Sequence, residues 1–374
     1  MYDGPIVDCD VHYSRRRESE LHEHLAPEWR DFVTRDGGKV RLHGALAMDL
    51  RPEGPNRLDS LLDSGDPAGS DHKTMCEQLL DRYDVKRAVL TSAGPFAVPN
   101  GDLSHALCVA HNDWTRDRWL DGLDDDRLCG TILVETHSPE AAAAEVRRVG
   151  QDPRFVAVHV AYNSLGKPLG HPVYHPIYEA AAELGLPIVT HVNASEQFGG
   201  SGAFVAGGSH IHFRGESYLA GQQCTINHVV SMIVHGVFEK FPNLRYLTME
   251  AGVSWLASLA LKLDGSYDLI KAESRWVRRW PGEYLHDHVA VTTQPCEASA
   301  GTRRPFVEEL SLVDGIEDML CFSSDYPHWD SDDPMYISAT LPKAWHDKVF
   351  HANAERILRL PSTDAPRRPA AAAA

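Results

Sequence analysis

Short runs of apolar and β-branched residues recur along the whole chain, and longer stretches with helical spacing follow them. We expect eight of these runs to form strands: residues 5–10, 87–91, 128–134, 155–160, 187–192, 244–249, 289–293 and 319–324. Each run is almost continuously apolar, which is typical of parallel strands that are buried on both faces. The intervening stretches that we expect to be helical include 70–83, 105–120, 139–149, 174–184 and 224–241. Eight alternating units with short links predict a closed (β/α)₈ TIM barrel, an α/β fold.

The chain has 374 residues, whereas a barrel of this type needs about 250. We assign the surplus to an insertion after the first strand at 13–69, a glycine-rich lid loop after the fifth strand at 194–223, and a disordered tail at 361–374. No repeat or second boundary is visible, so residues 1–360 are expected to form a single domain. A doubly wound sheet is disfavoured because no G-x-G-x-x-G segment follows the first strand.

The charge balance excludes several classes of partner. The 36 Lys and Arg residues against 53 Asp and Glu residues give a net charge of −17, which disfavours nucleic acid and anionic membrane surfaces. No apolar run approaches the roughly 18 residues that a membrane span requires. The seven cysteines are scattered without a C-x-x-C pair, and no basic segment followed by an apolar run opens the chain. We therefore expect a cytoplasmic protein without a disulfide framework.

Residues of metal-ligand type gather at the ends of four predicted strands. In a TIM barrel the carboxyl ends of the strands converge on one pocket. The residues at these ends are Asp10 and His12 on the first strand, His191 on the fifth, Glu250 after the sixth and Asp325 after the eighth. Asp8 lies on the same face of the first strand as Asp10 and competes for its role. The presence of five such residues at the ends of four strands predicts a metal site.

This donor set is rich in oxygen, which favours iron or manganese over zinc. Bridging carboxylates also allow two metal ions to share one site. A further histidine would complete a two-metal shell. His228 is our first choice for it, and His210 and His212 are the other candidates.

Four segments carry a family resemblance. They are IVDCDVH at 6–12, HPIYEAAAELGLPIVTHV at 175–192, HGVFEKFPNLRYLTMEAGVSWL at 235–256 and CFSSDYPHWD at 321–330. With them the sequence resembles the metal-dependent TIM-barrel enzymes of the amidohydrolase superfamily, in the branch related to aminocarboxymuconate-semialdehyde decarboxylase. That family holds its metal with H-x-H on strand one, His on strand five, His on strand six and Asp on strand eight. The resemblance therefore implies metal roles for His12, His191 and Asp325.

The sequence departs from the family pattern at three positions. Asp10 replaces the first His of H-x-H, Glu250 replaces the strand-six His, and His159 ends the strand on which some hydrolases carry a carboxylated lysine. These features most resemble a sub-branch whose characterised members use dinuclear iron and dioxygen to hydroxylate unactivated C–H bonds. We therefore expect a non-haem di-iron monooxygenase acting on a small or thioester-linked organic acid. The alternative is a metal-dependent hydrolase or non-oxidative decarboxylase of a small carboxylate, with Asp325 as general base.

The complete set of expected roles follows from these arguments. The cofactor is a pair of transition-metal ions, with iron favoured and manganese or zinc as alternatives. The partners are a small-molecule substrate, O₂ in the oxygenase case, and either a second copy of the chain or a related subunit. The predicted metal ligands are Asp10, His12, His191, Glu250, Asp325 and His228; the catalytic groups are Asp325, Glu250 and His228; and the substrate contacts are His328 and His159.

Overall fold

The computed structural model describes residues 2–38, 55–92, 94–96, 98, 100–162, 166–192, 222–297 and 304–360. Eight parallel strands follow one another in chain order, each hydrogen-bonded to the next. They are β1 (Ile6–His12), β2 (Val85–Thr91), β3 (Leu128–Val134), β4 (Phe155–Val160), β5 (Ile188–His191), β6 (Tyr246–Met249), β7 (Val289–Thr292) and β8 (Leu320–Cys321). The prediction of eight parallel strands is confirmed.

The segment after β8 closes the ring against β1. The backbone N–H of Cys9 donates to the carbonyl oxygen of Phe322 at 3.0 Å, and that of His12 donates to Tyr326 at 2.7 Å. The predicted strand 319–324 is therefore correct as an extended segment, although only its first part has the regular pairing of a strand with β7. The fold is a (β/α)₈ barrel, as the sequence predicts.

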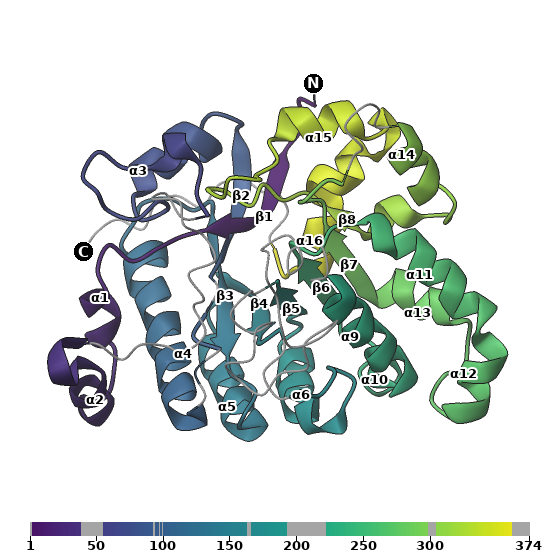
Figure 1. The fold of residues 1–374 in the computed structure, drawn as a ribbon, viewed down its shortest axis with the longest axis horizontal. Coiled ribbons are helices and arrows are strands. Elements are labelled where there is room, and N and C mark those ends of the chain that lie inside the picture. The colour runs from purple at the N-terminus through teal and green to yellow at the C-terminus, as the bar shows by residue number, and fades with distance from the viewer. Residues whose placement is uncertain are drawn as a thin grey trace, which may run out of the picture.

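Helices surround the strands on the outside (Figure 1). They are α1 (Ser19–His22), α2 (Pro27–Gly38), α3 (His72–Met75), α4 (Gly101–Thr115), α5 (Pro139–Val149), α6 (His175–Glu183), α9 (Gln222–Val234), α10 (Val237–Lys240), α11 (Ser254–Gly265), α12 (Tyr267–Glu273), α13 (Pro281–His288), α14 (Arg304–Leu310), α15 (Pro334–Thr340) and α16 (Asn353–Ile357). Short helical turns are η1 (Leu58–Ser60), η2 (Cys76–Leu80), η3 (Arg116–Leu120), η4 (Pro172–Tyr174), η5 (Ile316–Met319), η6 (Lys343–Trp345) and η7 (Lys348–Ala352).

The predicted helices lie where the structure has helices, but some of their ends differ from the predicted ones. The predicted helix 224–241 is divided into α9 and α10 at Gly236, whose φ of 71° lies in the left-handed region that glycine adopts without strain. The predicted helix 105–120 begins earlier, at Gly101, because the side chain of Asn100 caps it by accepting the N–H of Leu103 at 3.0 Å.

The predicted insertion contains α1, α2 and η1, and residues 39–54 within it lie outside the described residues. The predicted lid also lies outside them, apart from Gln222 and Gln223, which begin α9. The tail 361–374 is likewise not described. The assignments of lid, tail and single domain therefore stay predictions.

Side chains from the strands fill the barrel interior. Val7, Val89, Val189 and Leu247 belong to one buried cluster, and Ile357 of α16 joins it. The last helix thus packs into the core of the barrel, and the polar site lies at the carboxyl ends of the strands. Full burial of each such aliphatic side chain contributes roughly 1.5–3 kcal/mol.

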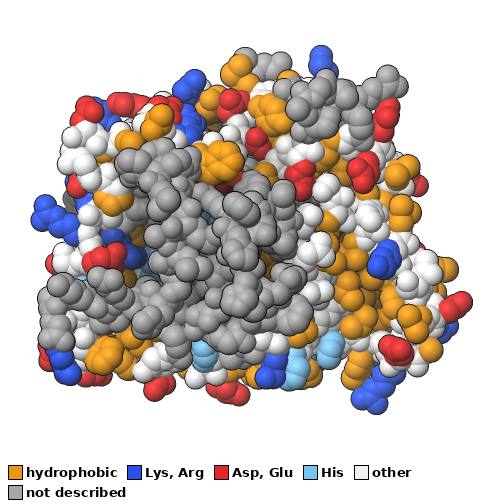
Figure 2. Space-filling model, viewed as in Figure 1, with side chains coloured by type: hydrophobic (Ala, Val, Ile, Leu, Met, Phe, Trp, Pro, Cys, Tyr) orange, Lys and Arg blue, Asp and Glu red, His pale blue; other side chains and the backbone are white. Residues whose placement is uncertain are grey.

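On the face shown in Figure 2, the coloured Lys and Arg side chains are scattered among acidic ones and form no basic patch. Among the residues described, no helix is both long and apolar enough to cross a membrane.

Candidate metal centre

The residues predicted from the strand ends come together at one place. Asp10 and His12 lie on β1, His191 ends β5, and Glu250 and Asp325 follow β6 and β8. Glu250 and Asp325 have φ values of 53° and 57°, a left-handed conformation that few non-glycine residues adopt. Strain of this kind costs about 1–3 kcal/mol and is found preferentially at functional sites.

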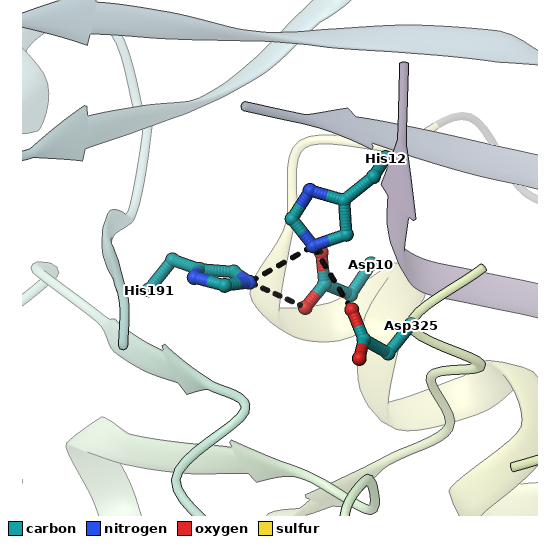
Figure 3. Close-up of side chains that lie close together, drawn as sticks. All are labelled: Asp10, His12, His191 and Asp325. Atoms are coloured by element: carbon teal, nitrogen blue, oxygen red, sulfur yellow. Dashed lines mark hydrogen bonds and ion pairs between the residues drawn. The ribbon is translucent and has the colours of Figure 1, made fainter. Parts of the chain in front are cut away.

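A first donor group consists of Asp10, His12, His191 and Asp325. Figure 3 shows these four side chains pointing toward one another. Nε2 of His12 lies 2.9 Å from Oδ1 of Asp325, and Nε2 of His191 lies 3.3 Å from Oδ2 of Asp10. The two Nε2 atoms are 3.1 Å apart. The four donor atoms all lie within 4.8 Å of one another, a spacing at which a single ion could contact all of them.

A second donor group shares two members with the first. It consists of His12, Glu250, Asp325 and His328. Nδ1 of His328 lies 2.8 Å from Oδ1 of Asp325, and Oε2 of Glu250 lies 3.2 Å from Nε2 of His191. His12 and Asp325 belong to both groups. The arrangement can therefore hold one ion or a closely spaced pair.

The charges at the site are strongly coupled. Burial, and then the charge of Asp325, raise the pKa of Glu250 to about 8. Burial opposes the charged form of His191, but Asp10 and Glu250 outweigh it and raise its pKa to about 10. Burial likewise opposes ionisation of Asp325, yet His328 and His12 hold its pKa well below the usual range. The carboxylates of Asp10, Glu250 and Asp325 lie so close together that a positively charged ion among them is favoured.

Asp10 provides a test of whether a metal fits. Both of its carboxylate oxygens are fully buried, and neither accepts a hydrogen bond of regular geometry from the described residues. A buried carboxylate without such bonds is costly, and a divalent cation would satisfy it. The mixed set of carboxylates and imidazoles suits a transition metal of the iron or manganese type.

Neighbouring groups orient two of the ligands. Nδ1 of His191 lies 2.6 Å from the carbonyl oxygen of Val192, which can only accept, so this nitrogen carries a proton. In the neutral ring Nε2 is then free to bind a metal. Nε2 of Gln294 donates to Oδ2 of Asp325 at 3.1 Å. No role was predicted for Gln294 from the sequence; its position just after β7, at the carboxyl end of a strand, is the signal that could have found it.

Asp8 has a different function from Asp10. Its Oδ1 accepts the backbone N–H of Ser324 at 2.9 Å and that of Asp10 at 3.2 Å. It therefore connects β1 to the segment after β8, and it belongs to neither donor group. Burial raises its pKa to about 7.

The structure argues against the prediction that His228 is a metal ligand or catalytic group. Its Nδ1 accepts the backbone N–H of Leu169 at 3.1 Å, and its Nε2 lies 2.6 Å from the carbonyl oxygen of Tyr162. Both ring nitrogens are thus used by the main chain, and burial lowers the pKa of the ring to about 4. The other two candidates, His210 and His212, lie outside the described residues.

The two predicted substrate contacts both lie beside the cluster. The ring of His328 is 4.2 Å from that of His12, between ring centres, and His328 belongs to the second donor group. The ring of His159 is 6.5 Å from that of His191, and its buried Nδ1 has no hydrogen-bond partner among the described residues. Burial lowers the pKa of His159 to about 3, so this ring is neutral.

Several solved structures share this fold. An amidohydrolase from Mycobacterium avium subsp. paratuberculosis is 21% identical, with a TM-score of 0.69 over 96% of this chain and 100% of its own. A 2,6-dihydroxybenzoate decarboxylase is 18% identical, with a TM-score of 0.65 over 95% and 98% of the two chains. A 5-carboxyvanillate decarboxylase from Novosphingobium aromaticivorans, solved with manganese, is 19% identical, with a TM-score of 0.62 over 94% and 96%. At these identities the likeness concerns the fold.

No curated protein matches the sequence. The sequence model of the amidohydrolase family, in contrast, matches residues 7–360, nearly the whole described chain. The match includes every strand of the barrel apart from Ile6 and all the residues of both donor groups. This chain therefore belongs to the amidohydrolase family of TIM-barrel enzymes.

Proposed function

We propose that this chain is a metal-dependent, non-oxidative decarboxylase of a small carboxylic acid. The observation that carries the proposal is the convergence of Asp10, His12, His191 and Asp325 into one buried donor group at the barrel mouth. Two of the similar structures are decarboxylases of aromatic hydroxy acids. An aromatic hydroxy acid is accordingly the first substrate class to test. Hydrolysis of a small carboxylate derivative is the nearest alternative reaction at the same site.

A metal bound to this donor group would hold the substrate carboxylate and lower the energy of negative charge on the substrate. Loss of CO₂ breaks a C–C bond and leaves its electron pair on carbon, which must then accept a proton. His328 is our candidate for the residue that supplies this proton. Its Nδ1 is engaged by Asp325, so Nε2 is the nitrogen available to the substrate.

The test is anaerobic incubation of the manganese-loaded protein with a panel of hydroxybenzoic acids. We expect release of one CO₂ for each acid consumed, with none from the His12→Ala protein. His328→Gln should retain manganese and lose turnover. If no acid releases CO₂ anaerobically and turnover instead requires O₂, the proposal is wrong.

A second candidate is the di-iron monooxygenase expected from the sequence. The observation that favours it is Glu250, which adds a third carboxylate and makes the second donor group overlap the first at His12 and Asp325. Such an arrangement suits two metal ions. The test is oxygen uptake by iron-loaded protein with a reductant and the candidate acids. Uptake in step with a hydroxylated product would establish this function in place of decarboxylation.

A further inference from the structure

A second group of metal-ligand side chains lies far from the barrel mouth. His72 is on α3, Cys76 begins η2 one helical turn later, and Asp125 lies in the loop before β3. Because the barrel mouth is at the carboxyl ends of the strands, Asp125 stands at the opposite end of β3. None of these residues takes part in the function proposed above, and the inference that follows is independent of it.

The three donor atoms are close together. Nε2 of His72 lies 2.9 Å from Oδ2 of Asp125 and 3.4 Å from Sγ of Cys76, and the sulfur lies 3.8 Å from the same carboxylate oxygen. A tetrahedral zinc ion, with bonds of about 2.0–2.3 Å, needs its ligand atoms roughly 3.3–3.6 Å apart. The observed separations lie on both sides of this range, so shifts of a few tenths of an ångström would bring all three atoms to ligand distance.

The degree of burial suits a bound ion that keeps contact with solvent. The side chain of Asp125 is only 6% exposed, that of His72 is 24% exposed, and Cys76 is partly buried. Water can therefore reach the group and provide a fourth ligand. Cysteine, histidine and aspartate are all zinc ligands, and a site with three protein ligands keeps its fourth position for water.

A positive group already lies against these donors. Nη2 of Arg127 is 2.7 Å from Oδ2 of Asp125 and 3.4 Å from Sγ of Cys76. The rest of the guanidinium has separate anchors, since Nε is 2.8 Å from Oδ1 of Asp125 and Nη1 is 2.8 Å from Oδ1 of Asp81. Because the guanidinium is planar and rigid, an ion at these donors would have to turn the whole group away from Asp125.

We propose that His72, Cys76 and Asp125 form a second metal site, which takes a divalent ion of the zinc class with one water molecule. Binding converts the thiol of Cys76 to a thiolate, releases its proton to solvent, and displaces the Arg127 guanidinium from Cys76 and Oδ2 of Asp125. The ion would connect η2 to the start of β3. It would reinforce the wall of the barrel and take no part in the reaction at the mouth.

Cobalt titration of the full chain tests the site, because a thiolate bound to Co²⁺ gives a charge-transfer absorption in the near ultraviolet. Neither donor group at the barrel mouth contains a cysteine, so this band reports the second site alone. We expect the band to saturate at one equivalent for this site and to disappear when Zn²⁺ is added. Asp325→Ala should keep the band, whereas Cys76→Ser should lose it and still bind metal at the mouth.

Cys296→Ser is the matched control, since Cys296 is also partly buried and belongs to none of the donor groups found among the described residues. It should keep the band. Absence of the band in the unmodified protein, or its persistence in Cys76→Ser, would overturn the proposal.

Arg127→Gln distinguishes a metal site from a simple ion-pair network. If Arg127 competes with the ion, its removal should tighten Zn²⁺ binding several-fold. An unchanged or weaker affinity in a protein that still binds metal at the mouth would contradict the proposed displacement. Should this variant fail to fold, Cys76→Ser and its control still decide the question.

Discussion

Asp325 is the residue on which both donor groups at the barrel mouth depend. It contacts His12, His328 and Gln294. We predict that Asp325→Ala abolishes both metal retention and turnover, because the two donor groups lose their shared carboxylate together. Elemental analysis of purified protein measures the first effect. Asp314→Ala removes an exposed carboxylate and should leave the metal content unchanged; equal loss in both variants would refute the assignment.

Gln294 donates a hydrogen bond to Asp325 and would act on a bound metal through it. Outer partners that orient metal ligands typically contribute about 10–100-fold to metal affinity. We predict a loss of this size for Gln294→Leu, measured by competition with a chelator of known affinity. A fall in turnover with unchanged metal affinity would instead make Gln294 a substrate contact.

The site also makes a prediction about pH. His191, His328 and Glu250 have pKa values raised to about 10, 9 and 8. A group whose pKa is higher in the folded state binds more protons there, so its stabilising effect is present at low pH and is lost as the pH rises. Metal-stripped protein should therefore lose stability between about pH 7 and 10.

The same protons compete with metal for the donor atoms, so metal affinity should rise over this range of pH. Denaturant titrations with and without Mn²⁺ measure both effects. A metal-stripped protein that becomes more stable from pH 7 to 10 would contradict the charge arrangement described here.

At the scale of the element, the sequence was sufficient for the strands and for the grouping of the residues at their carboxyl ends. Near-continuous apolar runs identify buried parallel strands, and their carboxyl ends can meet only at one mouth. For this reason Asp10, His12, His191, Glu250 and Asp325 could be predicted together. Gln294 was not among them: its position just after β7 places it at the same mouth, but the sequence pattern does not encode its contact with Asp325.

His228 is the opposite case, a residue to which the sequence assigned a role that the structure argues against. The spacing of apolar residues correctly placed it on a helix, but that pattern says nothing about which polar groups its ring will meet. Its two nitrogens are used by backbone groups of Tyr162 and Leu169, about 60 residues earlier in the chain. Such a histidine stabilises the packing of α9 and resembles a metal ligand only by residue type.

The short turn η3 permits a prediction about packing alone. Trp119 is 2% exposed and packs edge-on against Tyr13, at 5.4 Å between ring centres. Its indole N–H has no hydrogen-bond partner among the described residues, so Trp119→Phe removes volume and no hydrogen bond. We expect a loss of about 1–3 kcal/mol of stability in denaturant titrations, with unchanged metal content. Trp280→Phe, at a position 52% exposed, should cost less than about 0.5 kcal/mol.

At the scale of the whole molecule, the barrel separates its two proposed metal sites. Ligands at the mouth come from four different parts of the ring, whereas His72, Cys76 and Asp125 join one helical turn to one neighbouring loop. An ion at the mouth therefore stabilises the closed ring as a unit, and an ion at the other site stabilises only a local contact. Removal of the ion from the mouth and removal of the ion from the second site should therefore lower the folding stability by different amounts. Variants that lack one of the two sites separate these effects.

Removal of metal is the measurement that makes this difference visible. An ion present at 100 times its dissociation constant stabilises the folded state by about 2.7 kcal/mol. We predict that chelation lowers the Tm of the unmodified protein and that added Mn²⁺ restores most of the loss. Cys76→Ser should show nearly the same Mn²⁺-dependent rise, because the mouth is intact, while His12→Ala should show little. If chelation leaves the Tm of fully loaded protein unchanged, the donor groups at the mouth do not hold a stabilising ion, and the proposed metal centre is wrong.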